Sequence, residues 1–195
     1  ISSGDTAYTA VLENRDGQVQ QTEGECGTEI PAENAWLLLE AAEGYDYADH
    51  SLELEMTVNP DGRSLTDPEV MVTLSDGLEQ VEIRQVTAWE KDGRQEDITE
   101  EEWIRAEEEA PDERTGESHV LFSWREAKED EKRPSENTTY RIRFRCRMSE
   151  DMRNESFLSG DEEVLFAGAQ LTGNAGASGE EEAIAGAEAK VSIEW

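Results

Sequence analysis

The chain has 195 residues, 48 of them acidic and 17 basic, which gives a formal charge of −31 at neutral pH. Nucleic acids and anionic lipid surfaces are bound through clustered cations, so this composition excludes both as expected partners. No apolar run approaches the roughly 18 residues that a membrane-spanning helix requires, and residues 1–5 do not resemble a signal peptide, so we expect no membrane insertion. The length and the even spread of apolar segments predict one domain over residues 1–195.

The first predicted element is a strand at Thr6–Leu12, which alternates in polarity and is followed by an Asp-Gly turn signal. Residues 18–32 are polar and contain two glycines and a proline, so they predict a loop. The apolar run at Trp36–Leu39 is too short for its periodicity to distinguish a strand from a helix.

The middle of the chain alternates strand patterns with turn signals. Between its last two strands, Thr99 and Glu102 have the spacing of a capping box, which predicts a short helix over residues 99–109. Residues 149–160 are mostly polar and predict a connecting loop. The predicted strands are Ser51–Val58, Glu69–Leu74, Val81–Trp89 and His119–Trp124.

The clearest pattern is the strict alternation of apolar and basic residues over Tyr140–Met148, which predicts a strand with one buried face. Its apolar face carries Tyr140, Ile142, Phe144, Cys146 and Met148, and its outer face carries Arg141, Arg143, Arg145 and Arg147. The arginines could bind an anion or pair with acids on a neighbouring strand. We favour an ion-pair ladder with Glu53 and Glu55, because opposite charges on adjacent strands stabilise a sheet by roughly 0.2–1 kcal/mol each.

The end of the chain predicts two further strands. Residues 163–171 are apolar almost throughout, as expected for a strand buried on both faces. Residues 173–186 are rich in glycine, alanine and glutamate and predict a flexible connector, and Ala187–Trp195 alternates as a last strand. Eight or nine short strands with turns between them indicate an antiparallel β-sandwich of immunoglobulin-like or jelly-roll type.

The predicted core of this sandwich is the set of inward positions on its strands. It consists of Tyr8, Leu12, Trp36, Leu38, Leu52, Leu54, Met56, Val72, Val81, Ile83, Val120, Phe122, Tyr140, Ile142, Phe144, Val164, Phe166, Val191 and Ile193.

No sequence motif of a hydrolase, zinc enzyme or nucleotide-binding enzyme is present, and the two histidines are not spaced as paired ligands. We therefore expect a protein that is not an enzyme. Calcium is the one cofactor to consider, since Asp46, Asp49 and Asp161 supply hard oxygen ligands in predicted loops, but we favour the interpretation that they are solvated loop acids. Three aromatic residues near the first two acids, Trp36, Tyr45 and Tyr47, could form a sugar-binding platform or simply anchor loops.

The later part of the chain carries three short groups of residues at regular spacing: Tyr140, Ile142, Phe144 and Met148, then Asn154, Phe157 and Gly160, then Val164, Phe166, Ala169 and Gln170. In these residues the chain resembles the TasA/camelysin family of secreted bacterial β-sandwich proteins. The resemblance implies an extracellular or cell-surface fibre subunit whose partner is another copy of itself, added by strand donation.

For such a subunit, residues 1–12 are the candidate donor strand, with Tyr8, Ala10 and Leu12 as the side chains that enter a neighbour's groove. Ala187–Trp195 is the second candidate, and the alternative for residues 1–12 is an ordinary first strand of their own domain. A different class of function is a calcium- or carbohydrate-binding module of a cell-surface protein. In either extracellular setting we expect a disulfide between Cys26 and Cys146, whereas a reducing compartment would leave both as thiols.

Overall fold

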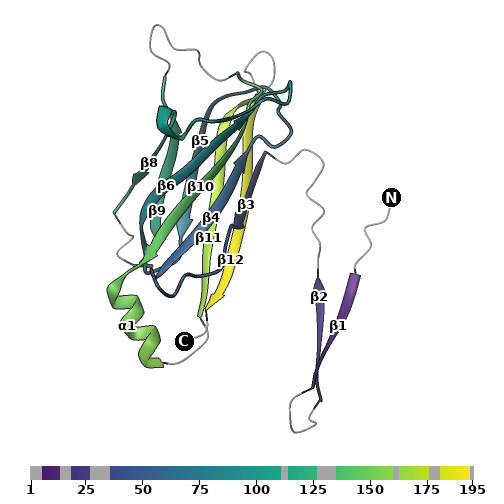
Figure 1. The fold of residues 1–195 in the computed structure, drawn as a ribbon, viewed down its shortest axis with the longest axis vertical. Coiled ribbons are helices and arrows are strands. Elements are labelled where there is room, and N and C mark those ends of the chain that lie inside the picture. Colours follow the sequence, from purple (N-terminus) through teal and green to yellow (C-terminus); the bar gives the residue numbers. More distant parts are fainter. Residues whose placement is uncertain are drawn as a thin grey trace. The chain divides into compact units, whose positions relative to one another are not determined.

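The chain divides into two compact units in the computed structural model, Ile1–Asn34 and Ala35–Trp195, where the sequence predicts a single domain. The structure describes residues 6–13, 19–26, 36–110, 114–126, 135–159, 163–175 and 181–193 (Figure 1). Among these residues, no helix has the length and apolar character needed to cross a bilayer.

The first unit contains a two-stranded hairpin of β1 (Thr6–Glu13) and β2 (Val19–Cys26), paired antiparallel from Thr6↔Cys26 to Glu13↔Val19. The expected strand at the start of the chain is therefore present. The loop expected over residues 18–32 is wrong where β2 lies, because β2 is mostly polar and lacks the apolar alternation that marks a strand.

The second unit is a β-sandwich, which confirms the fold class expected from the sequence. In the first sheet the strand order is β3-β4-β10-β6-β7, and in the second it is β12-β11-β5-β9-β8, with every neighbouring pair antiparallel. The first sheet consists of β3 (Leu37–Ala41), β4 (Ser51–Val58), β10 (Thr139–Met148), β6 (Leu78–Trp89) and β7 (Gln95–Asp97). The second consists of β12 (Glu181–Ile193), β11 (Glu163–Ala175), β5 (Leu65–Leu74), β9 (Ser118–Trp124) and β8 (Ile104–Glu108).

The arginine-bearing strand β10 lies at the centre of the first sheet, between β4 and β6, and its side chains alternate as predicted. Ile142, Phe144 and Cys146 are fully buried, whereas three of the four arginines are exposed. The rings of Phe144 and Phe122 meet across the two sheets at a centroid distance of 5.0 Å. This contact joins the middle of both sheets through one continuous apolar core.

Most of the predicted core residues are buried, but not all. Trp36, Val81, Ile83, Phe166 and Val191 are only partly buried, and Leu38 and Val164 are exposed. The side chains of Tyr8 and Leu12 lie outside the described residues. The confirmed core positions are Leu52, Leu54, Met56, Val72, Val120, Phe122, Tyr140, Ile142, Phe144 and Ile193.

Strand β11 is not buried on both faces, which corrects the interpretation of its apolar sequence. Leu165, Ala167, Ala169 and Leu171 face the core, while the residues between them face outward and Val164 is 55% exposed. Small residues occupy both faces, so the run reads as apolar throughout even though only one face is covered.

The flexible connector expected at residues 173–186 is wrong for residues 173–175 and 181–186, and residues 176–180 lie outside the described residues. Strand β11 continues to Ala175 and β12 already begins at Glu181, with pairs such as Gly173↔Ala183 between them. Glycine and alanine are poor strand formers by propensity, but here the pairing of two long strands overrides that preference.

The predicted helix at residues 99–109 is replaced by a single 3₁₀ turn, η1 (Thr99–Glu101), followed by strand β8. The Thr99 hydroxyl accepts a hydrogen bond from the Val86 amide at 2.9 Å and donates one to Asp97 at 2.6 Å, so it is not free to cap a helix. Glu102 then adopts a left-handed conformation with φ of 49°, which ends the turn.

The predicted loop at 149–160 is instead the helix α1 (Glu150–Ser159). Ser149 caps its first turn by accepting a hydrogen bond from the Met152 amide at 3.2 Å. The helix starts against the β5–β6 turn, where Gly77 has a φ of +77° and an added Cβ would lie 2.6 Å from the Met152 side chain. Glycine at this position therefore allows the helix to approach the sheet.

Strand β6 departs from a regular ladder at two points. Its register with β10 shifts between Arg143 and Phe144 and again between Arg145 and Arg147. Gln80, near the second shift, has a φ of 55°. Such bulges bend a strand and increase its twist.

Candidate functional site

The outer face of the first sheet carries the charged cluster around the arginines of β10. Arg141 and Arg143 each direct an Nε atom at a separate oxygen of the Glu55 carboxylate, at 3.0 Å and 2.7 Å. Glu55 lies opposite Arg143 on β4 and is buried, so its charge is neutralised by two guanidinium groups from the same neighbouring strand. Its proximity raises the pKa of Arg143.

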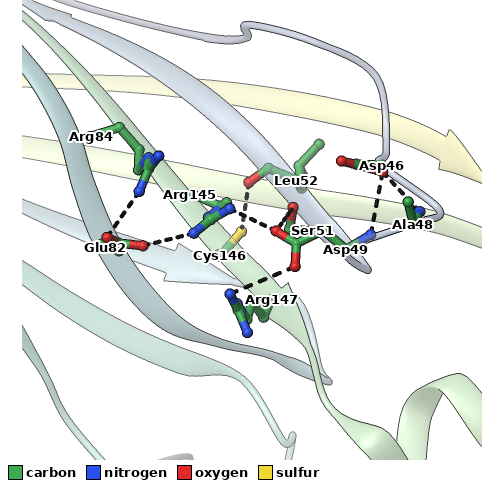
Figure 2. Close-up of polar contacts among 10 residues, drawn as sticks. All are labelled: Asp46, Ala48, Asp49, Ser51, Leu52, Glu82, Arg84, Arg145, Cys146 and Arg147. Carbon is green, nitrogen blue, oxygen red and sulfur yellow. Dashed lines mark hydrogen bonds and ion pairs between the residues drawn. The ribbon is translucent and has the colours of Figure 1, made fainter.

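A second group of ion pairs surrounds Arg145, which lies between β4 and β6 (Figure 2). Its guanidinium donates to Asp49 at 2.6 Å and to Glu82 at 2.9 Å. Arg147 lies 3.6 Å from the same Asp49, and Arg84 lies 3.0 Å from Glu82. Hydrogen bonds from Arg145 and then Arg84 lower the pKa of Glu82.

Glu53 is the member of the predicted ladder that is not used as expected. It is opposite Arg145 in the register, yet among the described residues it makes no ion pair within 4 Å, because Asp49 and Glu82 occupy that guanidinium. Glu53 instead lines a polar hollow of about 500 Å³ on the same face. The hollow is formed by Glu53, Arg84, Gln85, Asp97, Thr99, Glu100 and Arg143.

The loop acids considered for calcium already have partners within the protein. Asp46 accepts hydrogen bonds from the Ala48 and Asp49 amides at 2.8 Å and 3.3 Å and so closes its own turn. Asp49 is bound by Arg145 and Arg147. Asp161 lies outside the described residues, and the described part of the chain holds no group of three or more side chains suited to a metal ion.

The three aromatic residues considered for sugar binding do not form one platform. Trp36 lies beside the last residues of β4, where the Arg63 guanidinium stacks on it at 3.6 Å. Tyr45 and Tyr47 lie near the first residues of β4 and pack edge to face at 5.0 Å. Tyr45 is buried, with its hydroxyl near Met148 Sδ, so these side chains anchor loops at opposite ends of the strand.

Cys146 is a buried free thiol, with its Sγ atom 3.6 Å from the Leu52 carbonyl oxygen. Burial raises the pKa of this thiol to about 12, so it is no nucleophile at neutral pH. Cys26 belongs to β2 in the other compact unit, and its side chain lies outside the described residues. The predicted disulfide between the two cysteines therefore stays a prediction, as do the donor roles of Tyr8, Ala10 and Leu12.

Two features of the surface were not predicted from the sequence. Asp49 and Glu82 were not assigned to the arginine cluster, although Glu82 alternates with Val81 and Ile83 in a recognisable strand pattern. The second feature is the outer face of the three central strands of the second sheet, β11, β5 and β9, which carries few charges. Its signal was available, because residues 164–179 contain no charged residue in a chain that is one-third charged.

Together these observations define a β-sandwich with a cluster of ion pairs on the outer face of one sheet and few charges on the three central strands of the other. No family model matches the chain, and no curated protein sequence matches it significantly. Solved structures with a similar fold include the collagen-binding domain of the surface protein RspB from Erysipelothrix rhusiopathiae, at 9% identity and a TM-score of 0.50. That match covers 99% of this chain and 61% of the RspB chain.

Two structures of the Enterococcus faecalis surface protein ACE are also similar, each at 9% identity. Its collagen-binding subdomain has a TM-score of 0.44 over 81% of this chain and 95% of its own, and a longer ACE structure has 0.49 over 96% and 60%. At such identity the likeness shows the fold alone. The resemblance to the TasA/camelysin family is not tested by these matches.

Proposed function

We propose that this protein is an extracellular structural subunit of a surface or matrix filament, that it is not an enzyme, and that it polymerises by donating its N-terminal hairpin to a neighbouring copy. The observation that carries this proposal is the division of the chain into two compact units. The sandwich has ten strands and a continuous core of its own without residues 1–34. The hairpin is thus available for a role outside the sandwich.

The stability of the hairpin supports the same role. Strands β1 and β2 form a two-stranded sheet, and a lone two-stranded hairpin is at best marginally stable in water. Adding one of its edges to the sheet of another copy would supply the missing backbone hydrogen bonds. The sandwich offers β12, its longest edge strand with 13 residues, as the acceptor.

An extracellular setting agrees with the strongly acidic surface and with a fold that the RspB surface protein also contains. Self-repulsion at a charge of −31 opposes assembly, so polymerisation should strengthen as salt screens the carboxylates.

The test compares the intact chain with a variant lacking residues 1–34, using light scattering and electron microscopy across a salt series. We expect filaments from the intact chain only. Circular dichroism and thermal melting of the shortened variant serve as the control that its sandwich still folds. Equal assembly of both proteins, or monomers of the intact chain under every condition, would disprove strand donation.

A carbohydrate-binding module is the second candidate, and the polar hollow on the first sheet is the observation that favours it. Its amide, hydroxyl, carboxylate and guanidinium groups are the kinds that bind sugar hydroxyls. A glycan array with the native protein tests this function, and Gln85→Ala and Arg143→Ala variants should lose any binding found.

A further inference from the structure

The outer face of the second sheet differs from the rest of this acidic protein. Among the described side chains, the residues of β11, β5 and β9 that point away from the core include two carboxylates, those of Asp67 and Glu69, both in the first half of β5. We call this surface the neutral face; it consists of Val164, Phe166, Gly168, Gln170, Thr172, Asp67, Glu69, Met71, Thr73, His119, Leu121 and Ser123.

The register makes the centre of the neutral face a continuous patch. Gln170 of β11 pairs with Met71 of β5, which pairs with Leu121 of β9, so the three side chains form one row across the sheet. In the next row, the Thr73 hydroxyl and the His119 ring lie 3.1 Å apart and satisfy each other. Covering this patch therefore leaves few polar groups to be desolvated without a partner.

The margins of the neutral face carry charges of both signs. On the β12 side, Lys190 lies 3.9 Å from Glu188. On the β8 side, Arg105 and Glu107 point outward, and the exposed Glu109 lies beside them, with its amide donating to the His119 carbonyl. Each margin thus has a cation beside at least one carboxylate, so a copy related by a two-fold axis can place its cations opposite the carboxylates of the first, which is the self-complementarity that such dimers need.

We propose that a second copy of this chain packs on the neutral face, sheet against sheet. Two molecules that each carry a charge of −31 repel wherever their carboxylates meet, and on this face almost none would. Its composition, with phenylalanine, methionine and leucine and few acids, is that of the centre of a protein interface. This contact goes beyond strand donation, because it is closed and lateral and makes no use of the hairpin.

The test is analytical ultracentrifugation of the full chain at about 0.01 M and about 0.15 M salt, where the screening length falls from about 30 Å to about 8 Å. We expect a monomer–dimer equilibrium that strengthens with salt. Leu121→Glu should weaken the dimer at least tenfold, since the two-fold places both new charges in one interface. Leu38→Glu, at a 37% exposed outward position of the first sheet, is the matched control and should leave dimerisation unchanged.

Gln170→Glu provides a second variant at an exposed position, where misfolding is not expected. The stoichiometry separates this contact from strand donation, because a two-fold contact stops at dimers whereas donation gives an open-ended series. Equal dimerisation of the native protein and both neutral-face variants would overturn the proposal. A chain that stays monomeric at both salt concentrations, or binds an uncharged polymer there instead of itself, would overturn it too.

Discussion

Replacing Glu55 by glutamine should measurably destabilise the sandwich, because one buried carboxylate neutralises two arginines. The Glu55 side chain is 9% exposed, forms an ion pair with Arg141 at 3.0 Å and accepts a hydrogen bond from Arg143 Nε at 2.7 Å. Glutamine keeps the shape of the side chain but removes its charge and one acceptor. The two guanidinium groups would then lie side by side without compensation.

The size of the destabilisation depends on how exposed the two arginine partners of Glu55 are. A hydrogen bond to a charged group contributes about 1.5–3 kcal/mol when buried, whereas exposed ion pairs contribute about 0.2–1 kcal/mol. The arginine side chains are 46% and 44% exposed, so each contact lies between these limits. We expect a loss of about 2 kcal/mol in total, which for a domain of this size lowers the melting temperature by about 4–8 °C.

The assay is urea denaturation followed by tryptophan fluorescence, with the melting temperature as a second measure. Glu53→Gln is the matched control, since the same change on the same strand removes no described ion pair and should cost less than about 0.5 kcal/mol. If both variants lose the same free energy of unfolding, the carboxylate of Glu55 does not stabilise the sheet through its arginines.

Three further predictions concern the α1 junction, the acid sensitivity and the cysteines. Gly77→Ala should destabilise more than Gly93→Ala in thermal melts, since both have a positive φ but only Gly77 has a neighbour in the way of a Cβ. The folded-state pKa of Glu82 is lowered, so the stabilisation by its carboxylate is complete above the ordinary carboxyl pKa and is lost as the pH falls through the lowered value. The difference in the free energy of unfolding between the native protein and Glu82→Gln should therefore disappear in acid. A difference that does not change with pH would contradict this prediction. We expect a disulfide between Cys26 and Cys146, so mass spectrometry after alkylation of the unfolded, unreduced protein should show no modified cysteine. Two modified cysteines would contradict the disulfide.

The fold class could be predicted because a strand with one buried face shows an alternation of polar and apolar residues in its own sequence. The alternation in β4 and β10 gives the orientation of every side chain in those strands. Where both faces of a strand carry small or apolar residues, as in β11, the same rule has no contrast to detect. The capping pattern misled for a different reason. Thr99 has the capping-box partner Glu102, but its hydroxyl is bound to Val86 and Asp97, whereas Ser149 lacks such a partner and still caps a helix.

The candidate site was less predictable because its partners come from distant parts of the chain. Glu55 could be proposed from the pattern of β4, but Asp49 reaches Arg145 from a loop and Glu82 reaches it from a bulged strand. A shift of register by one residue decides which acid meets which arginine, and no local pattern reports it. The uncharged run at residues 164–179 indicates only the β11 part of the neutral face, and the contributions of β5 and β9 appear only when the three strands are placed in order.

The bulges of β6 affect whether a strand from another molecule can add to the edge of the first sheet. Among the described residues, the outer edge of β6 beyond the short β7 pairs with no further strand, but the Glu108 carboxylate of β8 accepts hydrogen bonds from the Gln80 and Val81 amides at 3.2 Å and 2.6 Å. The edge is bent by the bulges, and two of its amide donors are already bound to a carboxylate. This part of the β6 edge is therefore protected against the addition of a strand from another molecule, so strand exchange between copies would have to use other edges of the two sheets.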